Sequence, residues 1–186
     1  MLWQRVFNEG GGVGSALLYG ENPNKGAGVF SASYYVKAYD SRGVLVAEKE
    51  AVGAIQQNGA FAVFAPNLFI GERVPVNAVF ERRVPLLWRR DVPAAEALQV
   101  QHIRLSLAPL TRVDAELVNT LRDELEVRAV AILYDEVGNA VGASQTTLTL
   151  AGEARAPLAF VWRAPFPRPP VRAAIIPFVT ARRVAR

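Results

Sequence analysis

A single histidine, His102, is the only imidazole in this sequence that is available for acid–base or metal chemistry. It lies in a strand-like stretch, LQVQHIRLSL, and no G-x-S-x-G nucleophile turn accompanies it, so a serine–histidine–acid triad has no recognisable signature. One histidine and no cysteine also exclude thiolate zinc sites, iron–sulfur clusters and histidine-based metal sites. We therefore expect His102 at the surface or rim of a strand, with no catalytic role.

Carboxylates are the other candidates for chemistry, since paired Asp and Glu side chains can bind calcium or carry out acid–base catalysis. The densest group is Asp123, Glu124 and Glu126, with Asp114 and Glu116 nearby in the sequence. Arginines are interleaved with these acids, and the calcium-loop pattern D-x-[DN]-x-[DN]-G is missing. We expect a solvent-facing lattice of ion pairs between neighbouring strands, with no metal and no cofactor.

Two glycine-containing segments invite a ligand-binding interpretation. Residues 8–16, NEGGGVGSA, lack the terminal Lys-Ser/Thr of a phosphate loop, and a strand follows them where a helix would be needed. A hairpin turn is the better interpretation. Residues 21–28, ENPNKGAG, form a loop in which Asn22, Pro23 and Asn24 are a candidate binding loop, because loops at the ends of sandwiches often bind partners.

The positive charge is concentrated at the C-terminal end, where residues 154–186 contain seven arginines and no acid. These arginines are Arg155, Arg163, Arg168, Arg172, Arg182, Arg183 and Arg186. A basic tail of this kind can contact anionic lipid or nucleic acid. It is short and matches no known motif, so we expect a solvated terminus and no specific nucleic-acid partner.

The elements that would position any site come from an internal repeat, first visible in YDSRG (39–43) and YDEVG (134–138). The similarity continues on both sides of these motifs, in the same order. The matched segments are 16–24 with 115–123, 33–50 with 128–145, 59–67 with 157–165, and 74–80 with 169–175. Ordered matches of this kind indicate a tandem duplication.

Each motif predicts a β-hairpin, in which the aspartate accepts backbone hydrogen bonds and the glycine adopts a positive φ. The tyrosine before it would close the core at the sheet edge, with its hydroxyl at the rim. The first structural hairpin is Tyr39, Asp40 and Gly43, and the second is Tyr134, Asp135 and Gly138. We interpret both as folding devices, with no catalytic residue in either.

Short alternating runs closed by Gly, Pro and Asn predict about six strands in each repeat. The predicted strands are 2–8, 13–21, 30–40, 43–50, 60–65, 74–82, 99–108, 111–119, 125–135, 140–149, 154–163 and 170–179. The fold class is therefore all-β, with two tandem immunoglobulin-like β-sandwich domains. The first domain spans residues 1–84, and the second spans 98–186 and includes the basic tail.

Residues 85–97 form the predicted linker, which contains a short helical turn that Asp91 would cap and Pro93 would open. Leu87 and Trp88 are too apolar for a free tether. We expect these two side chains to pack between the domains, and exposure in a partner site is the alternative.

The sequence resembles a known family at the second hairpin. Ile132-Leu133-Tyr134-Asp135 is similar to the motif of FxLYD-type immunoglobulin-like domains in bacterial envelope proteins, with Ala131 in place of the phenylalanine. The chain also resembles uncharacterised tandem-sandwich proteins of small-genome bacteria, which share ENPN, the YD-x-x-G hairpin and the GERVPV segment found here at 71–76. Such proteins commonly carry an N-terminal membrane anchor and a soluble outer part. The resemblance implies no catalytic residues.

We therefore expect a non-enzymatic module of the cell envelope that binds a protein partner or spaces it from the membrane. The alternative is a self-assembling subunit of a surface filament or sheath, joined through edge strands such as LWQRVF and IIPFVT. No apolar run is long enough for a membrane helix, and no secretion signal is visible. The expected location is the outward-facing envelope if an upstream anchor exists, and the cytoplasm otherwise.

Overall fold

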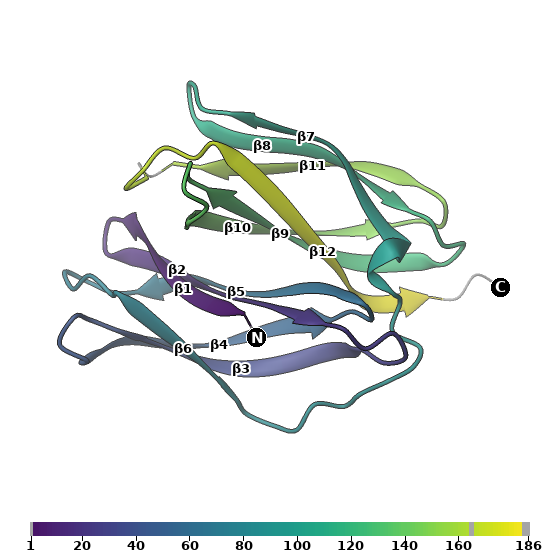
Figure 1. Ribbon diagram of the computed structural model, residues 1–186, viewed down its shortest axis with the longest axis horizontal. Helices are drawn as coiled ribbons and strands as arrows, with labels where there is room; N and C mark the ends of the chain where they lie inside the picture. The colour runs from purple at the N-terminus through teal and green to yellow at the C-terminus, as the bar shows by residue number, and fades with distance from the viewer. Residues whose placement is uncertain (1, 164–165, 184–186) are drawn as a thin grey trace.

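The computed structural model describes residues 2–163 and 166–183, and its fold is all-β, as the sequence predicts (Figure 1). All twelve predicted strands form, although several extend a few residues further than expected. The strands are β1 (Trp3–Gly10), β2 (Val13–Asn22), β3 (Val29–Tyr39), β4 (Leu45–Ile55), β5 (Gly59–Phe69), β6 (Asn77–Arg82), β7 (Leu98–Ser106), β8 (Thr111–Asn119), β9 (Glu124–Tyr134), β10 (Ala140–Leu150), β11 (Arg155–Trp162) and β12 (Arg172–Arg183). None of the described helices is long and apolar enough to cross a membrane.

The strands form four three-stranded antiparallel sheets, and the same strand order appears twice. The first half of the chain, β1–β6, contains the sheets β1-β2-β5 and β4-β3-β6. The second half, β7–β12, contains the corresponding sheets β11-β8-β7 and β10-β9-β12. The strand order of the first half is therefore repeated in the second half.

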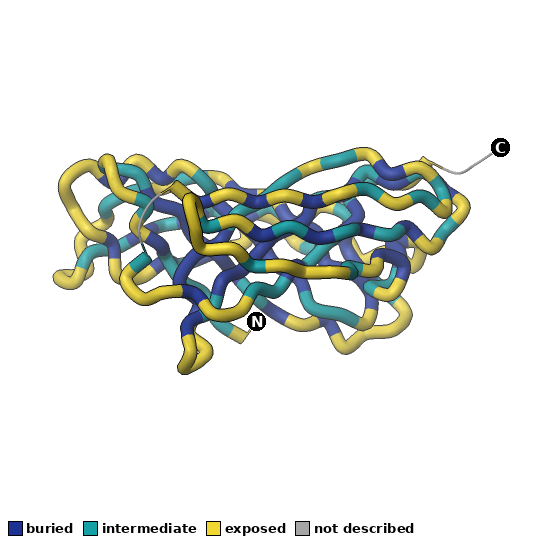
Figure 2. Tube along the Cα trace, turned by 90° about the horizontal axis from the view of Figure 1, so that it is seen from above, coloured by how far each residue is buried: buried dark blue, intermediate teal, exposed yellow. Residues whose placement is uncertain are grey.

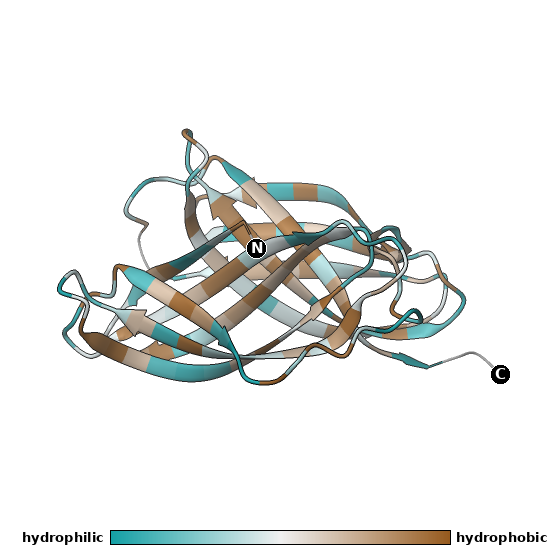
Figure 3. Ribbon diagram, turned by 60° about the horizontal axis from the view of Figure 1, so that its bottom comes forward, coloured by the Kyte–Doolittle hydropathy of each residue, from teal (hydrophilic) through white to brown (hydrophobic). Residues whose placement is uncertain are grey.

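Each half has its own hydrophobic core between its two sheets, which is the arrangement of a β-sandwich. In the first half, Leu18 and Val63 from one sheet pack with Val36 and Phe80 from the other. A corresponding core fills the second half. Figure 2 shows that the turns are mostly exposed, whereas buried residues alternate with less buried ones along many of the strands. Hydrophobic and hydrophilic residues alternate along the strands in the same way (Figure 3).

A third core joins the two halves into one stack. Leu17 and Phe64 on the sheet β1-β2-β5 cluster with Val130, Ile132 and Phe178 on the sheet β10-β9-β12. These two sheets are therefore covered on both faces, and β4-β3-β6 and β11-β8-β7 form the outer layers (Figure 1).

Two arginines add hydrogen bonds across the same junction. The Arg5 guanidinium donates to the carbonyl of Ala140 at 2.9 Å, and the Arg128 guanidinium donates to the carbonyl of Val52 at 3.2 Å. The halves are consequently joined by backbone-directed hydrogen bonds as well as by apolar contacts.

The linker lies against the first half, and the expected packing of Leu87 and Trp88 between the halves is wrong. Their exposed fractions are 72% and 47%, because the faces of the two inner sheets already fill the junction. The linker is held instead by the bridge between Gly28 and Arg89 and by the buried side chain of Val92.

The expected helical turn in the linker is the 3-10 helix η1 (Ala95–Ala97). Asp91 does not cap it, since no side chain caps this helix. The Asp91 carboxylate binds the Arg89 guanidinium instead.

Acidic and basic clusters that are far apart in the sequence meet at the end of β12. Arg183 pairs with Glu124 at 3.2 Å and with Glu126 at 3.0 Å, and Arg182 pairs with Asp123. Ion pairs between neighbouring strands therefore form here, with arginines of the predicted solvated tail as the cations. The single lattice expected from the sequence is wrong, because Asp114 and Glu116 are on β8, Glu124 and Glu126 are on β9, and these strands belong to different sheets. Arg186 lies outside the described residues.

Candidate binding cleft between the two halves

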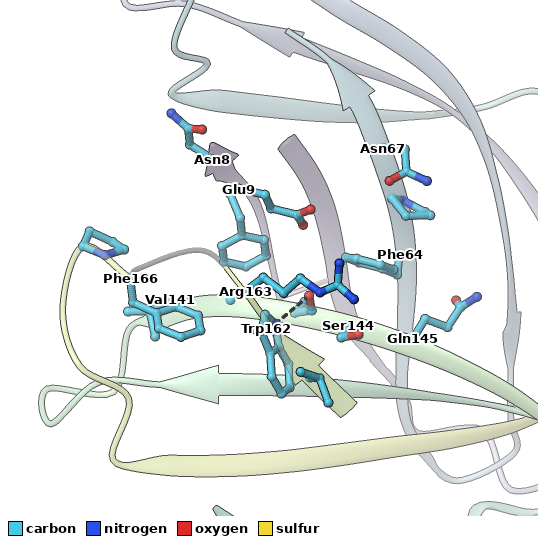
Figure 4. Close-up of a pocket in the computed structure, with 16 residues that line it drawn as sticks. Asn8, Glu9, Phe64, Asn67, Val141, Ser144, Gln145, Trp162, Arg163 and Phe166 are labelled. Atoms are coloured by element: carbon cyan, nitrogen blue, oxygen red, sulfur yellow. Dashed lines mark hydrogen bonds between the residues drawn. The ribbon is translucent and has the colours of Figure 1, made fainter. Parts of the chain in front are cut away.

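A cleft of about 400 Å³ opens at one end of the junction between the two halves (Figure 4). It is lined by the end of β1, the middle and end of β5, the start of β10, the end of β11, and Arg163, Phe166 and Pro167. The lining residues are Phe7, Asn8, Glu9, Phe64, Pro66, Asn67, Val141, Gly142, Ala143, Ser144, Gln145, Val161, Trp162, Arg163, Phe166 and Pro167. A second groove of about 720 Å³ adjoins it and shares Phe7, Asn8, Val141, Phe166 and Pro167.

The floor of the cleft depends on a glycine and two aromatic rings in the second half. A Cβ on Gly142 would lie 2.7 Å from the ring of Phe166, so a larger residue here would have to displace that ring from its place against β10. The indole Nε1 of Trp162 donates to the carbonyl of Ala143 at 3.1 Å (Figure 4). These contacts fix the shape of the cleft where β10 and β11 separate.

Polar side chains from both halves enter the cleft without making protein hydrogen bonds. Among the residues that the structure describes, Glu9, Asn67, Ser144 and Arg163 have no side-chain hydrogen bond or ion pair, and the Gln145 Oε1 atom is buried without a partner. A buried acceptor without a donor is costly unless a ligand or water satisfies it. The arrangement suits a ligand with apolar groups, hydrogen-bond donors and charge.

The candidate binding loop lies at the far end of β2 from the cleft. Asn22 is buried, and its amide donates to the carbonyls of Ala27 and Gln56, so this side chain holds the loop. Asn119 does the same at the end of β8, where its amide donates to the carbonyls of Asp123 and Ala151. Pro23 and Asn24 are exposed beside Asn22.

The first structural hairpin has the predicted turn chemistry. The Asp40 carboxylate accepts from the N–H groups of Arg42 and Val44, and Gly43 has a φ of 76°. The hydrogen bond from Val44 is the largest cause that lowers the pKa of Asp40. The Tyr39 carbonyl accepts from the N–H of Val76 at 2.8 Å, which ties the hairpin to the strand β6 region.

The second hairpin repeats this arrangement. The Asp135 carboxylate accepts from the N–H groups of Val137 and Asn139, Gly138 has a φ of 83°, and the Tyr134 carbonyl accepts from the N–H of Val171. Desolvation raises the pKa of Asp135, but the hydrogen bonds from Asn139 and Val137 and the charge of Arg168 together outweigh it, so the net shift of this pKa is downward.

The residues that first suggested chemistry do not meet at one site. His102 is on the outer sheet, with a φ of 55° at a bulge in β7, and its Nδ1 atom is 3.9 Å from Glu116. Asp114 binds Arg112 on the same outer face, whereas Glu124 and Glu126 are on β9, in the neighbouring sheet. No group of three or more potential metal ligands occurs among the residues described.

Sequence reasoning placed no binding site at the cleft, although it had considered residues 8–16 as a glycine-rich loop and Arg163 as part of the basic tail. One signal was present: both faces of the run AVAIL, residues 129–133, are apolar, as in a strand buried between two layers. That signal indicates an inner sheet. It does not indicate which other sheet packs on it or at which residues that contact ends.

Comparison with known proteins gives no family for this chain. No family model matches the sequence, and no curated protein matches it.

Among solved structures, similar chains include a mutant of beta-glucuronidase 2 from Bacteroides uniformis, with a TM-score of 0.28, 11% identity, and coverage of 83% of this chain and 22% of that one. A putative beta-galactosidase from Bacteroides fragilis has a TM-score of 0.27 and 12% identity, with coverage of 89% and 32%. An exo-chitosanase from Amycolatopsis orientalis has a TM-score of 0.26 and 11% identity, with coverage of 90% and 25%. The chain thus spans a third or less of these proteins, and similarity at this level carries no argument about activity.

Proposed function

We propose that the chain is a non-enzymatic module of the cell envelope that binds a protein partner or holds it away from the membrane. Its two halves would be tandem immunoglobulin-like sandwiches of the FxLYD type, as the sequence resemblance implies. The observation that carries the proposal is the cleft between the halves, with an aromatic floor and unpartnered polar side chains from both sides.

The cleft favours binding over spacing alone. Phe7 and Phe64 from the first half and Trp162 and Phe166 from the second supply aromatic surface, which is enriched where proteins bind their partners. Glu9 and Arg163 add one charge of each sign. A simple spacer would need neither an open cleft nor unsatisfied polar groups at the junction.

Site-specific photo-crosslinking in cells that produce the native protein tests the proposal. A photoreactive amino acid at Asn67, inside the cleft, should crosslink to a discrete protein in the envelope fraction. The same amino acid at Arg122, an exposed position outside the cleft, is the matched control. A chain found only in the cytoplasmic fraction would contradict the envelope assignment, and an absence of crosslinks from Asn67 would contradict partner binding.

Self-assembly into a surface filament or sheath is the second candidate, because β1 and β12 are free edges of the two inner sheets. Pro177 in β12 lacks an N–H, which weakens that edge as a pairing site. Light scattering across a range of concentrations separates the candidates, since an assembling subunit grows in mass and a binding module does not.

A further inference from the structure

The edge strands β4 and β10 occupy the same position in the two halves but are protected differently. Lys49 in β4 lies opposite Val36, and its Nζ atom donates to the carbonyl of Pro66 in β5 at 2.8 Å. An inward-pointing charge on an edge strand blocks the addition of another strand. The corresponding residue of β10 is Ser144, opposite Ala131, and no hydrogen bond links its side chain to β11 within the described residues. The β10 edge therefore lacks the protection that β4 has.

Backbone groups of β10 point from this edge into the cleft. The Ala143 carbonyl accepts from the Trp162 indole, so it points away from β9. The pairing of β9 with β12 leads to the same conclusion about which backbone groups face outward. Pro177 of β12 has no N–H, so it must occupy a non-hydrogen-bonded pair with Ala129. The backbone groups of Ala129 therefore point toward β10. Residues two apart on a strand share one side, so the N–H and C=O of Gln145 also face away from β9.

Side chains around the edge supply complementary chemistry. The Gln145 Oε1 atom is buried without a donor, and Arg163 has no anionic partner in the part of the chain that the structure describes. The rings of Phe64 and Phe166 form apolar surface nearby (Figure 4). A backbone N–H, a carboxylate and an apolar side chain, spaced along an extended chain, would satisfy all of these groups.

We infer that an extended peptide segment of a partner protein enters the cleft and adds as a strand to the edge of β10. Its backbone pairs with Gln145, one apolar side chain contacts the aromatic floor, and an acidic side chain binds Arg163. Strand addition of this kind takes affinity from main-chain hydrogen bonds and specificity from the pockets of alternate side chains. The inference rests on the proposed function and specifies its binding site.

A random linear hexapeptide library displayed on phage is the first probe, panned on the full chain. Counter-selection uses the Ser144→Lys variant, which gives β10 the lysine that protects β4. Enriched peptides should contain an acidic residue and an apolar residue. Their affinity for Ser144→Lys should fall at least about tenfold, because the edge is then closed.

Two further measurements do not depend on the folding of Ser144→Lys. Arg163→Glu should weaken the enriched peptides about tenfold, whereas Arg122→Glu, the same charge reversal at an exposed arginine outside the cleft, should leave affinity unchanged. N-methylation of the peptide at alternate residues should weaken binding roughly three- to tenfold for each main-chain hydrogen bond removed, and at the intervening residues it should not.

The outcomes separate this inference from the proposed function. If peptides bind but their affinity is unchanged by Ser144→Lys, Arg163→Glu and N-methylation, the proposal of partner binding stands and the assignment of the site to β10 is wrong. If no peptide is enriched, or if the cleft binds only soluble oligosaccharides, the strand-addition inference is overturned. Photo-crosslinking at Asn67 then decides whether partner binding itself survives.

Discussion

The sheets β4-β3-β6 and β10-β9-β12 have the same strand order and the same hairpin, yet one is an outer layer and the other is buried inside the stack. Aligned through their hairpin tyrosines, Tyr35 and Lys37 of β3 correspond to Val130 and Ile132 of β9. On the third strand of each sheet, Glu81 corresponds to Ile176. The two sheets therefore share one topology and differ in the chemistry of one face.

The outer version of this face pairs its own charges. Lys37 binds Glu81 at 2.9 Å, Arg83 binds Glu50 at 2.5 Å, and both cations lie over the ring of Tyr35. Such a face is stable in water and would be costly to cover with an apolar sheet.

The other pair of sheets shows the reverse exchange. Leu17 and Tyr19 of the inner strand β2 correspond to Asp114 and Glu116 of the outer strand β8, counting back from the buried asparagines that end both strands. Both ends of the four-layer stack are therefore polar, as the terminal units of repeat proteins are. The comparison indicates that the chemistry of their faces decides which sheets join, and we expect the third core to make the two halves unfold as one cooperative unit.

The largest loss of stability should come from exchanging the residue of the inner face for that of the outer face at one equivalent position. Ile132→Lys places an unpaired charge in the third core, where Ile132 is fully buried, and should destabilise the fold by about 4 kcal/mol or more. The reciprocal Lys37→Ile, on the outer face, should change stability little. Urea unfolding of both variants measures the difference, and equal losses would contradict the assignment of the two faces.

The second-largest loss of stability should come from truncating Phe178, an aromatic side chain of the third core. Phe178→Ala removes a fully buried ring from the third core and should cost about 3–5 kcal/mol. Arg83→Ala, at the corresponding position of the outer face, should cost no more than about 1 kcal/mol, because its ion pair is exposed. Thermal unfolding monitored by circular dichroism compares the two.

Converting the outer face into an interface should create association. The triple variant Lys37→Ile, Glu81→Ile and Arg83→Phe removes both ion pairs and gives β4-β3-β6 the apolar character of its inner counterpart. Its mass in light scattering should rise with concentration, with the unmodified chain as the control. A mass that stays constant would show that the charged residues are not what prevents another sheet from packing on the outer face of β4-β3-β6.

Acid should produce the smallest effect, and it should act on both hairpins alike. The pKa values of Asp40 and Asp135 lie below the ordinary value of 3.8 in the folded chain, so their stabilisation is complete above that pH and is lost as pH falls through the folded pKa. Unfolding midpoints measured between about pH 5 and pH 2 should fall more steeply for the unmodified chain than for Asp40→Asn with Asp135→Asn.

Local features were predictable from the sequence because their causes are local. Alternation located the strands, and Asp-x-x-Gly located both hairpins with their positive-φ glycines, Gly43 and Gly138. The match of 59–67 with 157–165 pairs Phe64 with Trp162, whereas the strand registers pair Phe64 with Ala159. Small apolar residues repeat too often in these strands for similarity alone to fix the register.

Long-range features were not predictable in the same way. Leu87 and Trp88 were expected at the junction because they are apolar, but packing there was decided by two complete sheet faces. The cleft arises where those faces stop overlapping, so Glu9 and Arg163 become neighbours of one cavity only after the halves stack. No spacing within either half encodes that offset.

The most direct test of the central claim is equilibrium urea unfolding followed residue by residue with NMR. Amides of Val36 and Leu117, one in each outer sheet, report separately on the two halves. Because the third core joins the halves, the account predicts coincident transitions with one midpoint. Two separate midpoints would contradict it, since the halves would then unfold independently.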